Sequence, residues 1–232
     1  MTDVTDGRAP MGKPALVKIC GIKQETTLQG MAGLRVDYIG FVFAKSRRQV
    51  TPERAAQLQA AARSVAMAAG KPPLTVGVFV NPTLEQLEQT LSVVPLDVVQ
   101  LHGEETPEFA RQVRERLNVD VWRALPVKDE DDSTAGAARL QAYAGAVSTV
   151  LLDTAGGGTG QTFRWDVIPA YQRAAVSSGL RLFVAGGLSP DNADKLVSAY
   201  RPEGVDISSG VETDGAKDNG KIAAFVERVN NA

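Results

Sequence analysis

The residues best suited to chemistry lie in one stretch, where an acid precedes a glycine-rich loop. The apolar run at residues 150–152 predicts a buried strand that ends on Asp153, and four glycines follow between residues 156 and 160. A carboxylate beside backbone N–H groups that can approach an anion closely suits acid–base chemistry on an anionic substrate. The loop holds neither a Gly-Lys-Ser/Thr sequence nor a G-x-G-x-x-G motif. A flexible surface connection is the alternative interpretation.

The elements that would position these residues alternate strictly between strand and helix. Short apolar runs predict strands at residues 15–19, 38–43, 74–80, 97–101, 120–124, 149–152, 182–185 and 204–207. Helices are predicted at about residues 25–34, 51–69, 84 onward, 106–117, 137–143, 165–178, 189–200 and 219–229, with Thr51, Thr106 and Ser189, each before a proline, as N-caps. This alternation predicts a single-domain (β/α)8 barrel over residues 14–232, with an open doubly wound sheet as the alternative. Residues 1–13 read as a disordered polar tail.

The carboxyl ends of the predicted strands bring the reactive side chains to one rim, where barrels of this kind place their active sites. Cys20 follows the first strand and would face Asp153 across the barrel mouth. A thiolate there could take a proton from carbon while the carboxylic acid opposite donates one. We therefore expect Cys20 to be exposed and partly ionised near neutral pH. A small buried hydrophobic residue is the alternative for a lone cysteine.

Three further polar residues come to the same rim. Gln100 lies within the fourth strand and His102 follows it, and His102 is either a base or a hydrogen-bonding group of the rim. Arg48 follows the second strand and could hold a substrate carboxylate as a bidentate fork. An ordinary surface arginine is the alternative for Arg48, and Arg47 is assigned to the surface.

Small residues follow the last two strands, where barrels of this class often bind phosphate through backbone N–H groups. These residues are Gly186 and Gly187 after the seventh strand and Ser208, Ser209 and Gly210 after the eighth. Either group alone could be a simple turn. Together they predict a phosphate site.

The composition excludes several classes of function. The chain of 232 residues has a formal net charge of −2 and no basic block, so no nucleic-acid partner is expected. No apolar run approaches the roughly 20 residues needed to span a membrane, and no signal core precedes the barrel. The single cysteine fits a reducing cytoplasm, and one histidine with one cysteine is too poor a ligand set for zinc. The acidic run at residues 128–132 reads as solvated surface.

The sequence resembles the phosphoribosylanthranilate isomerase family of tryptophan biosynthesis. The matching segments are residues 17–22, 40–43, 76–81, 99–104, 151–153, 157–160, 163–165, 186–188 and 206–212. Each segment is weak alone, but together they follow in order from about residue 16 to the C-terminus and lie at the expected strand ends.

The resemblance implies a barrel that needs no metal or cofactor and that acts on a small phosphorylated substrate. Its reaction is the Amadori rearrangement of N-(5-phosphoribosyl)anthranilate to 1-(2-carboxyphenylamino)-1-deoxy-D-ribulose 5-phosphate. By resemblance, Cys20 is the general base, Asp153 is the general acid and Arg48 holds the anthranilate carboxylate. The loop before Arg48 is one residue shorter than in family members, which keeps Arg47 as an alternative.

Other residues are assigned to substrate binding, and the chain is expected to be a cytoplasmic monomer or homodimer. The substrate-binding assignments are Gln100, His102, Gly158, Gly160, Gly186, Gly187, Ser209 and Gly210. A barrel that performs the same rearrangement on a histidine precursor is a second candidate, but such enzymes carry Asp where this chain has Cys20. A non-catalytic sensor of phosphorylated sugars is a third, which turnover would exclude.

Overall fold

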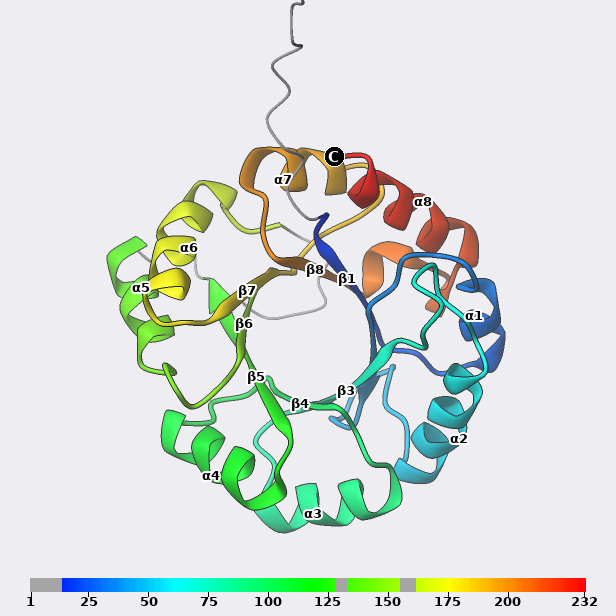
Figure 1. The fold of residues 1–232 in the computed structure, drawn as a ribbon, viewed down its shortest axis with the longest axis horizontal. Coiled ribbons are helices and arrows are strands. Elements are labelled where there is room, and N and C mark those ends of the chain that lie inside the picture. Colours follow the sequence, from blue (N-terminus) through cyan, green and yellow to red (C-terminus); the bar gives the residue numbers. More distant parts are fainter. Residues whose placement is uncertain (1–13, 128–132, 155–161) are drawn as a thin grey trace, which may run out of the picture.

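Eight parallel strands close into a barrel, and helices form a ring around it (Figure 1). The computed structural model describes residues 14–127, 133–154 and 162–232. The barrel strands are β1 Leu16–Cys20, β2 Tyr38–Val42, β3 Leu74–Phe79, β4 Val98–Leu101, β5 Asp120–Val127, β6 Thr149–Thr154, β7 Arg181–Val184 and β8 Gly204–Ile207. Because β8 pairs with β1 in parallel, the barrel is closed and the open sheet is excluded. The predicted (β/α)8 barrel is confirmed.

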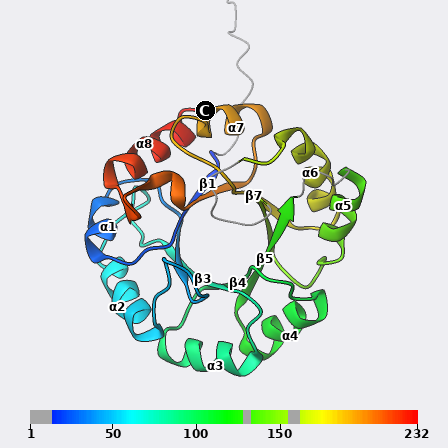
Figure 2. The same cartoon turned by 180° about the vertical axis from the view of Figure 1, so that it is seen from behind.

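One helix follows each strand, so the ring is continuous when the molecule is seen from behind (Figure 2). The helices are α1 Glu25–Gly30, α2 Pro52–Arg63, α3 Leu84–Val93, α4 Pro107–Leu117, α5 Ser133–Gln141, α6 Ile168–Ser177, α7 Ala193–Tyr200 and α8 Asn219–Asn230. Short elements add to two of the connections: the 3-10 helices η1 Trp165–Val167 and η2 Ser209–Val211, and the hairpin strands β9 Glu212–Thr213 and β10 Ala216–Lys217.

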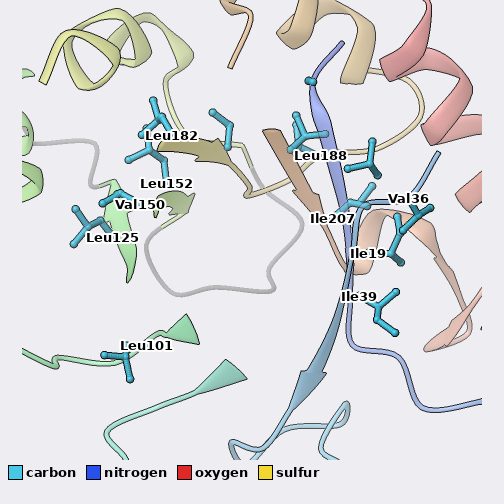
Figure 3. Close-up of a cluster of buried hydrophobic side chains, with 14 of the residues drawn as sticks. Ile19, Val36, Ile39, Leu101, Leu125, Val150, Leu152, Leu182, Leu188 and Ile207 are labelled. Atoms are coloured by element: carbon cyan, nitrogen blue, oxygen red, sulfur yellow. The ribbon is translucent and has the colours of Figure 1, made fainter. Parts of the chain in front are cut away.

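The alternation of side chains along each strand divides the core into two layers. Ile19 on β1, Ile39 on β2 and Ile207 on β8 belong to the outer layer, between the barrel and the helices (Figure 3). The alternate residues of the same strands, such as Leu16 on β1 and Tyr38 on β2, face the barrel interior. Since successive side chains of a strand point to opposite faces, Lys18 and Cys20 share the inward face with Leu16.

Three aromatic rings fill the interior of the barrel. Tyr38 and Trp122 lie edge to face with ring centroids 4.8 Å apart, and Trp122 and Phe183 have centroids 4.9 Å apart. Edge-to-face and tilted contacts of this kind are favoured by the quadrupoles of the rings. The barrel is therefore a packed core whose polar groups collect toward the carboxyl ends of the strands.

Two of the three predicted helix caps are confirmed. The hydroxyl oxygens of Thr51 and Thr106 accept hydrogen bonds from the backbone N–H groups three residues on, and a proline occupies the first turn of both helices. The prediction for Ser189 is wrong, because α7 begins at Ala193 after Asn192. Residues 189–192 form a turn instead, in which the Ser189 N–H donates a hydrogen bond to Asn192 Oδ1.

Several element boundaries differ from the prediction. The helices predicted at residues 25–34 and 51–69 end at Gly30 and Arg63. β5 continues to Val127, beyond the predicted end at residue 124, because its last residues pair with the end of β6, Val127 opposite Thr154. The hairpin of β9 and β10 was not predicted.

Some predictions concern residues outside the described part of the chain. They are the tail at residues 1–13, the acidic run at 128–132, and Gly158 and Gly160 of the glycine-rich loop. Within the described ranges, no helix has both the length and the apolar character to cross a bilayer. The same ranges contain no group of three or more His, Cys, Asp or Glu residues that could hold a metal ion.

Candidate active site

The candidate base and acid both lie at the carboxyl end of the barrel. Cys20 is the last residue of β1, and Asp153 is the residue before the end of β6. On the neighbouring strand β2, Gly40 pairs with Cys20, and a Cβ built on Gly40 would lie 2.8 Å from Cys20 Sγ. The sulfur thus occupies the space that Gly40 leaves free. A side chain at residue 40 would displace it.

Cys20 is more buried than the sequence predicts. Its side chain and backbone together are only 8% exposed, so the expectation of an open thiol is wrong. Burial raises the pKa of the Cys20 thiol, and the nearby carboxylate of Asp206 adds to this effect. The ammonium groups of Lys18 and Lys217 act in the opposite direction. A Cys20 thiolate is therefore stabilised by two lysines and not by water.

Asp153 contacts His102, the residue after β4, and a backbone N–H at the end of β6. Its Oδ2 lies 3.2 Å from Nε2 of His102, and its Oδ1 accepts a hydrogen bond of 2.8 Å from the Thr154 N–H. Nε2 of Gln100 lies 3.1 Å from Nδ1 of His102. In this orientation of the amide its nitrogen donates to Nδ1, which places the ring proton on Nε2, facing Asp153; the flipped amide would reverse the roles. His102 therefore orients the carboxylate.

Gln100 lies one layer below the rim. It is fully buried, and its Oε1 has no hydrogen-bond partner among the described residues. The sequence assigns Gln100 to substrate binding, but its visible contact is with His102. Its effect on a bound molecule would pass through His102.

Arg48 lies across the end of β1 and is clamped by a carboxylate. A Cβ built on Gly21 would lie 2.7 Å from Arg48 Cδ, which shows how closely the arginine crosses the strand end. Arg48 Nε and Nη2 donate to Oε1 and Oε2 of Glu212, at 2.7 and 3.0 Å. This bidentate pair uses one edge of the guanidinium and leaves the Nη1 edge for another anion. Arg47 is also within 2.8 Å of Glu212, but its side chain is 58% exposed.

Glu212 connects Arg48 to the environment of Cys20. It also accepts a hydrogen bond of 2.9 Å from Lys217 Nζ, and Lys217 in turn donates to the Ser208 carbonyl at 2.8 Å. Burial opposes ionisation of Glu212, but the hydrogen bonds from Arg48 and Lys217 outweigh it and lower the pKa to about 2. Glu212 was not predicted as a site residue, since no local sequence pattern indicates the hairpin that positions Lys217.

The predicted phosphate residues largely share one pocket. Gly187, Ser209 and Gly210 line a hollow of about 640 Å³ together with Thr162, Leu188, Ser189 and Asn192. Ser209 and Gly210 belong to η2, and the N-terminus of a short helix after the last strand suits phosphate.

Gly186 does not line this pocket. A Cβ built on Gly186 would collide with Thr154 and lie 3.1 Å from Asp153 Oδ1. Gly186, whose φ is +76°, therefore makes room chiefly for Thr154 and also for the neighbouring carboxylate of Asp153. The sequence had grouped it with the phosphate residues.

Comparison with known sequences finds one family. A sequence model described as N-(5'phosphoribosyl)anthranilate (PRA) isomerase matches residues 17–228. The N-(5'-phosphoribosyl)anthranilate isomerase of Brevibacillus brevis is 50% identical over 217 residues, which cover 92% of each chain. The enzyme of the same name from Bacillus subtilis is 38% identical over 221 residues, 95% of this chain and 97% of its own.

Solved structures agree with the sequences. Monomers generated from the dimeric phosphoribosylanthranilate isomerase of Thermotoga maritima superpose with a TM-score of 0.76 at 34% identity, over 94% of this chain and 100% of that one. A phosphoribosylanthranilate isomerase in complex with reduced 1-(o-carboxyphenylamino)-1-deoxyribulose 5-phosphate gives a TM-score of 0.73 at 32% identity, with the same coverage. The chain belongs to the N-(5'-phosphoribosyl)anthranilate isomerase family.

Proposed function

We propose that Cys20 and Asp153 are the base and the acid with which this chain isomerises N-(5'-phosphoribosyl)anthranilate in tryptophan biosynthesis. The observation that carries the proposal is that a thiol and a carboxylate lie at the same end of the barrel. A buried thiol at the end of β1 and a carboxylate beside His102 at the end of β6 share the interior of one barrel mouth. Arg48 lies at the same end of the strands, and so do the residues that line the predicted phosphate pocket.

Asp153 acts first, on the ring oxygen of the ribose. It donates a proton to that oxygen, the bond from the oxygen to C1′ breaks, and the anilino nitrogen forms a Schiff base. The carboxylate left on Asp153 keeps Nε2 of His102 3.2 Å from its Oδ2. Thr154 N–H bonds the other carboxylate oxygen, so neither oxygen is left without a donor when the proton leaves.

Cys20 then removes the proton from C2′ of the Schiff base. The electron pair of that C–H bond moves toward nitrogen and gives an enolamine, which tautomerises to the ketone product. Both steps need only proton transfers between the protein and the substrate, so an acid, a base and groups that hold anions are sufficient. The activity is tested by adding the protein to phosphoribosylanthranilate and following the loss of that compound's fluorescence. No loss of fluorescence with folded protein would contradict the activity.

We expect Arg48 to hold the carboxylate of the anthranilate ring through the guanidinium edge that Glu212 leaves open. A charge-assisted bond of this kind contributes roughly 1.5–3 kcal/mol, so Arg48→Ala should raise KM by about ten- to a hundredfold. kcat should change less, because the proton transfers do not involve Arg48. Steady-state kinetics measures both constants.

Arg47→Ala is the matched control, since Arg47 contacts the same glutamate but is mostly solvent-exposed. Its KM should stay near that of the unmodified protein. The opposite pattern, with the large effect at Arg47, would assign the carboxylate to Arg47 instead.

The phosphate pocket predicts that inorganic phosphate is a weak competitive inhibitor. Gly187→Ala should raise both the inhibition constant of phosphate and KM, because a methyl group would stand between the anion and the backbone N–H groups. Gly187 has φ +63°, so alanine there also strains the backbone, at a cost of about 1–2 kcal/mol. Inhibition kinetics and thermal unfolding measure the two effects separately.

Gly179→Ala provides the control for backbone strain. Gly179 has φ +65°, nothing lies within 4 Å of a Cβ built on it, and it connects α6 to β7 at the opposite end of the barrel strands. This variant should lose similar thermal stability but leave the inhibition constant unchanged. Equal inhibition by phosphate in the Gly187→Ala variant and the unmodified protein would place the phosphate elsewhere.

The assembly and cellular location are further proposals. We propose a cytoplasmic enzyme that acts as a monomer or homodimer and binds no nucleic acid. The single cysteine and the net charge of −2 support the location and the absence of a nucleic-acid partner. The Thermotoga maritima relative is dimeric, and sedimentation of this protein would distinguish the two assemblies.

A further inference from the structure

A charged pair lies inside the barrel. Lys18 of β1 is completely buried, and its Nζ donates a hydrogen bond of 2.9 Å to Oδ1 of Asp206 on β8. The two residues are register partners between the strands that close the barrel. Asp206 is 8% exposed, so water contributes little to either charge.

Stability gives little reason to keep such a pair. Removing two charges from water costs about as much as their attraction returns, and apolar residues of similar volume often serve as well or better. The interior layer nearby is already apolar and aromatic, with Tyr38 beside β1 and Phe183 beside β8. A lysine in this position therefore calls for an explanation other than folding.

The position of Lys18 relative to Cys20 supplies one. The two residues are separated by one position on β1, so their side chains point into the barrel on the same face. On the neighbouring strand β2, the residue that pairs with Cys20 is Gly40, which has no side chain to fill this space. The ammonium of Lys18 donates its hydrogen bond to Asp206, and its charge also acts on the Cys20 sulfur on the same face, where it favours the thiolate.

The other charged groups near Cys20 are linked to one another through Glu212. Lys217 of β10 is bonded to Glu212, and Glu212 also neutralises Arg48. The hydroxyl of Ser208, on the β8 side, donates to the Cys20 carbonyl at 3.1 Å. The charges that bear directly on Cys20 are Lys18, Asp206 and Lys217. Of these, Lys18 is the cation with no access to solvent.

We propose that Lys18 is a positioning residue that supplies the positive charge needed by the Cys20 thiolate, and that Asp206 limits this effect by holding the same ammonium group. The proposal rests on the proposed role of Cys20 as the base. When Cys20 releases its proton, Lys18 pairs with the sulfur as well as with Asp206. Burial without Lys18 would keep the thiol protonated, in line with the opposing effects of burial and Lys18 on the pKa of Cys20.

Two variants at neighbouring residues should shift the ionisation of Cys20 in opposite directions. Asp206→Asn removes the negative charge and keeps Lys18, so the midpoint for ionisation of Cys20 should fall. The double variant Lys18→Met/Asp206→Asn removes both charges without leaving a buried carboxylate unpaired, and the midpoint should rise. An opposite charge in contact shifts a titration by about one to three pH units, and shifts of that size are expected here.

Because Cys20 is the only cysteine in the chain, the rate of its alkylation by iodoacetamide against pH reports the thiolate directly. Lys195→Met is the matched control, since it removes an exposed lysine of α7, and its midpoint should match that of the unmodified protein. Circular dichroism establishes that each variant is folded. If the double variant does not fold, Asp206→Asn alone decides, because it adds no volume and retains Lys18.

An unchanged midpoint in the double variant, or shifts of both variants in the same direction, would overturn the proposal. If the pair has only a structural role, the variants should lose thermal stability while the midpoint for ionisation of Cys20 stays the same in both variants and the unmodified protein. The acid limb of kcat/KM against pH should follow the alkylation midpoints if Cys20 is the base. Alkylation that shifts as expected while the kinetic limb stays in place would uphold Lys18 as the partner of the thiolate and reject Cys20 as the base.

Discussion

Replacing Asp153 by asparagine is expected to lower kcat on the order of 10²–10⁴-fold, the usual contribution of a positioned proton donor. The amide is nearly the same size as the carboxyl group, and its oxygen can still lie beside His102 Nε2 as the carboxylate does. It cannot supply an acidic proton to the ribose ring oxygen. The ring would stay closed, and binding of a reduced product analogue should be almost unchanged. Steady-state kinetics and calorimetric titration with the analogue measure the two effects.

Glu227→Gln is the control for loss of a carboxylate from the protein as a whole. Glu227 is exposed on α8, on the outside of the barrel, so its removal should leave kcat and analogue binding as they are. An Asp153→Asn protein with kcat close to that of the unmodified enzyme would reject Asp153 as the acid. Loss of analogue binding in parallel with kcat would instead point to a role in positioning the substrate.

The order and type of the barrel elements could be predicted because each strand carries its own signal. β8, Gly204–Ile207, was predicted with its observed bounds, since a short apolar run follows one helix and precedes small residues. β5 was predicted too short, because its last residues are fixed by pairing with the end of β6 and not by their own composition. Local patterns locate an element well, but long-range pairing decides where it ends.

The candidate site was predicted only as far as the strand ends could reveal it. Parallel strands bring their carboxyl ends together, which is why Cys20, His102 and Asp153 could be grouped from the sequence. The partners of these residues could not be predicted. Lys18 pairs with Asp206, which is 188 positions away in the chain. The sequence around a charged residue in an apolar strand does not indicate which distant acid will pair with it.

The burial of Cys20 was missed for a similar reason. The sequence places Cys20 at a rim, and rims are usually open to solvent. Arg48 crosses the strand end beside Gly21, the charge of Lys217 acts on Cys20, and Glu212 joins these two cations. These contacts depend on the closure of the barrel between β1 and β8. They convert a predicted exposed thiol into one whose ionisation depends on its protein neighbours.

Replacing Cys20 by alanine is expected to abolish most turnover, because no other group in its place can take the proton from C2′. Loss of a general base typically costs 10²–10⁴-fold, and we expect kcat to fall on the order of that range. Alanine adds no volume beside Gly40, whose missing side chain leaves room for the sulfur, so the fold and analogue binding should persist. Single-turnover kinetics and analogue titration measure this difference.

Cys20→Ser sharpens the test, because it keeps a polar atom in nearly the same place. A hydroxyl is a far weaker acid than a thiol, so the buried Lys18 that favours a thiolate should not produce an alkoxide there. The serine variant should therefore be almost as slow as the alanine variant, although it retains a hydrogen-bonding group. If Cys20→Ala keeps substantial turnover, the base lies elsewhere on the rim. His102 is then the next candidate, since its ring lies 3.2 Å from Asp153 at the same end of the barrel.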